Sequence, residues 1–167
     1  MDSNQTLDII INKDEISATI KRKFAANRDL VWEAWTNPDI LDQWWAPKPF
    51  TSKTKEMDFK VGGRRLYAMV SPEGNEGWSA QEYTSIHPKD SFRFLSFFTD
   101  SEGTPNSALG PSEWNLDFSE HNGNTTVNIV IKRQSLEELE KIIAMGFKEG
   151  FAATLGYLDN YFESLKK

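Results

Sequence analysis

The chain has 167 residues, of which 13% are aromatic, and this length suits one domain with a sizeable core. Its net charge of −6 disfavours nucleic acids and anionic membrane surfaces as partners. Because the chain has no cysteine, disulfide bonds and thiolate metal sites are excluded.

Residues 1–15 lack the basic segment and apolar core of a signal peptide, so we interpret them as an N-terminal extension of a cytoplasmic protein. No stretch of the chain reaches the roughly 20 apolar residues of a membrane helix, so we expect no membrane insertion. Residues 16–167 contain neither a repeat nor a linker. They are predicted to form a single domain.

The first predicted elements are one strand and two short helices. Residues 16–24 alternate between apolar and polar side chains, which predicts a half-buried strand. Asn27 can cap a helix whose apolar residues recur every three or four positions and which ends before Pro38. A second short helix is predicted over 39–45, and Pro47 stops it.

The middle of the chain changes to a period of two, which predicts a series of strands separated by turns. Asn122-Gly123, between two alternating apolar runs, is the clearest hairpin signal. The predicted strands cover residues 51–58, 64–70, 78–86, 92–98, 112–119 and 125–132.

The last segment has the apolar spacing of a helix. Ser135 and Glu138 form a capping box, and a stripe of apolar residues continues to Leu165. Gly146 interrupts the stripe and predicts a bend or a break. The meander of strands has one apolar face that needs a cover, and the helix over 147–165 is the element long enough to supply it.

This element order and four local motifs resemble the START-like, birch-pollen-allergen-like helix-grip superfamily (SRPBCC). Within it, the chain resembles the bacterial family named after the activator of the heat-shock chaperone's ATPase (AHSA-like). The motifs are Asp29-Leu-Val-Trp-Glu-Ala-Trp-Thr36, Trp44-Trp45-Ala46-Pro47, Met57-Asp58-Phe59-Lys60-Val61-Gly62-Gly63-Arg64 and Gly146-Phe147. Asn27 departs from the family, where many members have proline. The resemblance implies an α+β fold with a curved seven-stranded antiparallel sheet around a long C-terminal helix and a cavity between them.

Several aromatic residues are candidates for lining this cavity. Trp44 and Trp45 either plug one end of the core or form the cavity mouth, where aromatic rings with a polar edge are well suited. The pattern of 64–70 leaves open which face points inward, and the resemblance favours Tyr67 and Met69 as cavity-lining residues. Plain core packing is the alternative for both.

Glu82 is the most informative polar residue. In 78–86 it shares a face with Trp78 and Ile86, and this face is predicted to point inward. A carboxylate there would anchor a ligand or titrate. The alternatives are an ion pair with Arg65 or an edge position in water.

Three functional hypotheses follow. The first is a carrier or sensor of an apolar or amphipathic small molecule, the second a protein-interaction module with a possible chaperone link, and the third a cyclase- or hydrolase-type enzyme. The two histidines lie in turns, so we predict no catalytic residue, no metal site and no cofactor, and we identify no protein partner. The predicted ligand-binding residues are Trp44, Trp45, Tyr67, Met69, Glu82, Phe94, Trp114, Phe147 and Phe151.

Overall fold

The structure, a computed structural model, describes residues 9–106 and 111–166. Within these residues it contains eight strands and four helices. The strands are β1 (Ile9–Asn12), β2 (Ser17–Phe24), β3 (Thr51–Met57), β4 (Arg64–Val70), β5 (Glu76–His87), β6 (Ser91–Thr99), β7 (Ser112–His121) and β8 (Asn124–Lys132). The helices are α1 (Arg28–Thr36), α2 (Pro38–Trp44), α3 (Leu136–Ala144) and α4 (Phe147–Ser164).

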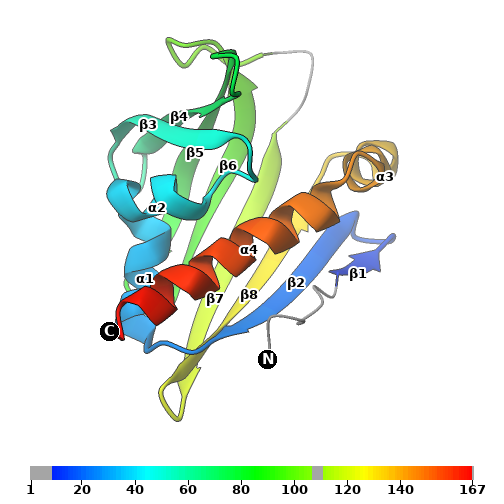
Figure 1. The fold of residues 1–167 in the computed structure, drawn as a ribbon. Helices are drawn as coiled ribbons and strands as arrows, with labels where there is room; N and C mark the ends of the chain where they lie inside the picture. Colours follow the sequence, from blue (N-terminus) through cyan, green and yellow to red (C-terminus); the bar gives the residue numbers. More distant parts are fainter. Residues whose placement is uncertain (1–8, 107–110, 167) are drawn as a thin grey trace.

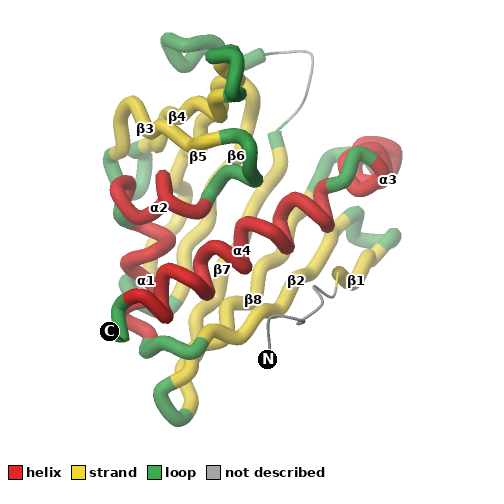
Figure 2. Tube along the Cα trace, viewed as in Figure 1, coloured by secondary structure: helices red, strands yellow, loops and turns green. Residues whose placement is uncertain are grey.

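The strands form one antiparallel sheet with the order β1-β2-β8-β7-β6-β5-β4-β3. From β3 to β8 each strand pairs with the next one along the chain, and β2 pairs with β8. Figure 1 shows α4 crossing the concave face of the curved sheet, with α1 and α2 at one end. Figure 2 distinguishes the sheet from the helices that cover it. The predicted α+β helix-grip fold is confirmed.

The sheet has one strand more than predicted, because β1 adds to the edge of β2. Ile9 lies opposite Ile20, and Asn12 opposite Ser17. Without β1, this part of β2 would leave its backbone N–H and C=O groups without partners at the sheet edge. The added strand comes from the segment interpreted as an extension, of which residues 1–8 lie outside the described part.

The helix boundaries follow from local hydrogen bonds. The Asn27 side chain accepts a bond of 3.0 Å from the Leu30 N–H, and the Ser135 hydroxyl accepts one of 3.1 Å from the Glu138 N–H, as the capping signals predict. Gly146 adopts φ +97°, a left-handed conformation that ends the helical path. The predicted interruption at this residue is therefore a break between α3 and α4.

The end of the domain under α1 and α2 is filled by aromatic side chains. The ring of Trp32 contacts those of Phe92 and Phe118 at centroid distances of 5.5 and 5.2 Å, and Trp35 contacts Trp44 at 4.6 Å. These side chains are buried. Space for a ligand must therefore lie elsewhere, toward the junction of α3 and α4.

Candidate functional site

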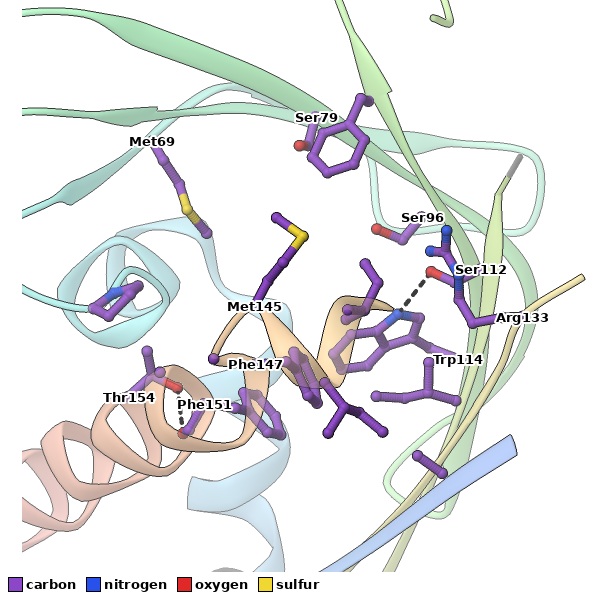
Figure 3. A pocket seen from close by; sticks show the side chains of 18 of the residues that line it. Met69, Ser79, Ser96, Ser112, Trp114, Arg133, Met145, Phe147, Phe151 and Thr154 are labelled. Atoms are coloured by element: carbon purple, nitrogen blue, oxygen red, sulfur yellow. Dashed lines mark hydrogen bonds between the residues drawn. The ribbon is translucent and has the colours of Figure 1, made fainter. Parts of the chain in front are cut away.

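A cavity of about 480 Å³ lies between the concave face of the sheet and the junction of α3 and α4. Its volume is in the range of roughly 300–1,000 Å³ that is typical of small-molecule sites. The helical side supplies α3, the first two turns of α4 and Met145 between them. The sheet side supplies residues from β2 and from β4 to β8. Figure 3 shows the space that these side chains surround.

Aromatic rings form much of the wall. Phe151 stacks on Phe147 at a centroid distance of 5.4 Å and meets the edge of Trp114 at 5.8 Å. Trp45 contacts both Trp114 and Phe151 at 6.0 and 6.4 Å. These contacts pack the rings of the wall against one another.

Behind the wall lies a buried guanidinium. Arg65 is fully buried, and its Cζ lies 4.1 Å from the centroid of the Tyr67 ring. It donates hydrogen bonds to Ser52, Thr54 and Asp42 at 3.1, 3.1 and 3.4 Å. Burial lowers the pKa of the Arg65 guanidinium, and the Asp42 carboxylate opposes this effect. Arg65 does not line the cavity, so we assign it a structural role under Tyr67.

Three of the polar residues that line the cavity, Ser96, Ser112 and Arg133, lie on neighbouring positions of the sheet. Ser96 lies directly opposite Ser112 in the pairing of β6 with β7, and both line the cavity. Arg133 continues the register in which Glu113 lies opposite Lys132, which places it across from Ser112. Figure 3 shows these three side chains on the side of the cavity opposite Met69.

Arg133 is the charged residue among those lining the cavity. Its side chain is 8% exposed, and its Nη2 donates a hydrogen bond of 3.0 Å to Glu138 Oε1. Its Nε is buried and has no hydrogen-bond partner within residues 9–106 and 111–166. The guanidinium therefore keeps unused donor capacity beside an apolar cavity.

Most of the predicted ligand-binding residues lie around this space. The cavity is lined by Trp45, Tyr67, Met69, Trp114, Phe147 and Phe151. Trp44 and Phe94 are buried but belong to the packed core and do not line the cavity. The Trp44 indole Nε1 donates a hydrogen bond of 3.0 Å to the Ala34 carbonyl oxygen. The ring of Phe94 stacks on that of Trp114 at a centroid distance of 5.4 Å.

The prediction that Glu82 points inward is wrong. Glu82 is exposed, whereas its neighbours Gln81 and Tyr83 are buried on the concave side. A β-bulge between Tyr83 and Ser85 inserts one residue, so that Tyr83 and Ile86 both lie opposite inward-facing phenylalanines of β6. The alternation extrapolated back from Ile86 therefore assigns Glu82 to the wrong face. The partner of Arg65 is Asp42 and not Glu82.

Sequence reasoning also missed the polar residues of the cavity, although a signal for each was present. Arg133 continues the alternation of Val127, Ile129 and Ile131, but it follows the predicted end of the strand at 132. Ser112 has the same parity as Trp114 in β7. Extending the alternation one step beyond 132 would have found Arg133, and Ser112 was already inside the predicted strand 112–119.

Two absences concern the part of the chain that the structure describes, residues 9–106 and 111–166. No helix there is long and apolar enough to cross a membrane. In the same residues, no three His, Cys, Asp or Glu side chains are grouped so that they could hold a metal ion.

Comparisons with known proteins agree with the geometry. The family model described as Activator of Hsp90 ATPase homolog 1-like protein matches residues 25–163. Protein Ms6760 from Mycobacterium smegmatis has a similar structure with a TM-score of 0.84 and 30% identity, over 92% of this chain and 94% of that one. A protein from Arthrobacter aurescens has a TM-score of 0.85 and 26% identity, over 93% and 90%. No curated protein matches the chain.

These likenesses support, in general terms, a role in binding a ligand or in acting with a chaperone. The matched region spans α1, α2, α3, all of α4 except its last residue, and every strand from β3 to β8. All four motifs that carry the resemblance in the sequence lie within the matched region, and Gly146-Phe147 leads into α4. The chain belongs to the family of Activator of Hsp90 ATPase homolog 1-like proteins.

Proposed function

We propose that the protein binds an apolar or amphipathic small molecule in the cavity between the sheet and the start of α4. The observation that carries the proposal is a space of about 480 Å³ lined mainly by aromatic and aliphatic side chains. Two of these side chains, Phe98 and Met145, are exposed, so the cavity is open to water. A ligand that fills the space removes apolar surface from water, which favours binding.

Nile red, a neutral apolar dye, tests the proposal by fluorescence titration. Gly150 lines the cavity, and a Cβ added there would lie 3.8 Å from its nearest neighbour, the Pro47 Cγ, which is an ordinary contact. Gly150→Leu therefore adds side-chain volume at this wall of the cavity, and its Cβ meets no clash. We expect saturable binding of one dye to the wild type and a loss of affinity of about tenfold or more in this variant, because the added side chain occupies the same space.

Gly156→Leu is the matched control. Gly156 is in the same helix, does not line the cavity and has no atom within 4 Å of an added Cβ. The same substitution should leave dye binding unchanged there. The proposal fails if the wild type shows no saturable binding, or if both leucine variants bind the dye as the wild type does.

A further inference from the structure

We infer that the ligand carries a carboxylate head, which Arg133 binds together with the hydroxyls of Ser96 and Ser112, while its apolar body fills the aromatic part of the cavity. This inference rests on the proposed function and names the class of ligand for the same site. Because Glu82 points outward, the polar group available to a ligand is a cation with hydroxyl donors and not a carboxylate. The expected head is therefore an acceptor with negative charge.

The guanidinium of Arg133 has N–H groups that can donate hydrogen bonds to a ligand. Arginine carries five N–H groups, and Glu138 accepts from Nη2, while Nε has no partner in the described residues. Burial of a cation with incomplete pairing is unfavourable, so a carboxylate reaching this side of the cavity gains a charge-assisted hydrogen bond.

The two serines supply further donors. The Ser112 Oγ accepts a hydrogen bond of 3.3 Å from the Trp114 Nε1, so its own proton remains for an acceptor. Ser96, directly across from it, lines the same space. Ser112 on β7 lies between Ser96 on β6 and Arg133, which follows β8. The donors therefore come from three neighbouring positions across the sheet. This arrangement matches a planar group with two acceptor oxygens.

The far side of the cavity disfavours an anion. A shallower hollow shares Pro47, Met69 and Gly77 with the cavity and carries the carboxylates of Glu73 and Glu76. Like charges repel, so an anionic head is less stable there than beside Arg133. The two sides together give a carboxylate amphiphile one preferred orientation.

The test compares decanoate with 1-decanol, which share the alkyl chain and differ in the head. Both compete with Nile red at about pH 7.5, where decanoate is ionised. We expect the wild type to bind decanoate about tenfold or more tightly than 1-decanol, since a hydrogen bond to a charged group contributes this much. Arg133→Gln should abolish the difference and leave the affinity for 1-decanol and Nile red unchanged.

Glu138→Gln keeps the guanidinium of Arg133, and it should change the affinity for decanoate in the direction opposite to Arg133→Gln. It removes the internal carboxylate that competes for Arg133, while the backbone bond from residue 138 to Ser135 remains possible. Decanoate should bind more tightly to this variant, and 1-decanol should not. If Arg133→Gln does not fold, this variant still decides the matter.

Ser96→Ala and Ser79→Ala form a matched pair in the same cavity. Ser79 lies on β5, one strand further from Arg133 than Ser96 on β6. Ser96→Ala should weaken decanoate binding by about fivefold, the effect of one hydrogen bond, and Ser79→Ala should not weaken it.

The results separate this inference from the function on which it rests. Saturable Nile red binding with equal affinities for decanoate and 1-decanol overturns the carboxylate inference and leaves the proposed function standing. A loss of affinity in Arg133→Gln that is the same for both competitors also overturns it. If neither the dye nor either competitor binds, the proposed function fails and the inference fails with it.

Discussion

The indole Nε1 of Trp45 donates a hydrogen bond of 3.0 Å to the phenol oxygen of Tyr67, and both side chains are buried. The bond joins the segment after α2 to strand β4 across one end of the cavity. Tyr67→Phe removes the acceptor and leaves the indole N–H without a partner. We expect a loss of about 1–3 kcal/mol in the free energy of unfolding, measured by urea denaturation.

Tyr83→Phe also removes a buried tyrosine hydroxyl, but for this variant we expect no loss in the free energy of unfolding. The hydroxyl of Tyr83 is buried and has no hydrogen-bond partner in the described residues. Its removal therefore relieves a desolvation penalty and breaks no bond. The free energy of unfolding should stay the same or rise, and a loss of more than about 1 kcal/mol would show that the hydroxyl has a partner.

The same tyrosine predicts a dependence on pH. Burial raises the pKa of Tyr83 above its ordinary value of 10.0, and the nearby Arg65 only partly opposes this. Above about pH 10 the unfolded chain loses this proton while the folded protein retains it, so the wild type loses stability as the pH rises. Tyr83→Phe has no ionisable hydroxyl at this position and therefore lacks this loss of stability at high pH. Its stability relative to the wild type should increase between about pH 10 and pH 11.5, in urea denaturation at each pH.

The loss of Asp42 and the loss of Arg65 should lower the free energy of unfolding by different amounts. Asp42→Ala removes the carboxylate and leaves a fully buried guanidinium, which should cost about 3–5 kcal/mol. Arg65→Met should cost less, because the Asp42 side chain is 29% exposed and still accepts bonds from Ser52 and Thr54. Chemical denaturation of the two variants gives the order. Equal losses would contradict the structural role assigned to Arg65.

Phe151 and Phe162 allow a comparison of two phenylalanines in α4. Both are buried, but Phe151 faces the cavity, whereas Phe162 packs on Phe24 at a centroid distance of 5.7 Å. Phe162→Ala should cost near 5 kcal/mol and Phe151→Ala only about 3 kcal/mol, because part of the Phe151 surface has no neighbour to lose. Urea denaturation of both variants measures the difference. A reversed order would mean that the cavity is filled by side chains.

The regular parts of the fold could be predicted because short-range chemistry determines them. Asn27 accepts the bond that begins α1, and the Asn122-Gly123 turn joins β7 and β8 as its sequence indicates. Strand β4 has the predicted bounds, and α4 begins at Phe147 as expected. In each case the signal lies within a few residues of its effect.

The orientation of Glu82 could not be predicted, because it depends on a bulge whose presence is decided by pairing with β6. Nothing near Tyr83 in the sequence marks the extra residue, and Ala80 on the outer face is as buried as a core residue. The proximity of Ser96 to Ser112 is a second case, although the inward direction of Ser112 could be read from its strand. Ser96 and Ser112 come together only through the register of two strands, which a single sequence does not contain.

The pairing of β2 with β8 joins segments that are about a hundred positions apart, since Phe24 lies opposite Thr125. On the ribosome the meander from β3 onward can form strand by strand as it emerges, because each of its pairings is local. Strand β2 is made among the first, and although β1 can pair with one of its edges early, its other edge can be paired only after β8 has left the exit tunnel. For most of the synthesis, the edge of β2 that will face β8 therefore has no partner, and an unpaired strand edge is a site at which a nascent chain can aggregate.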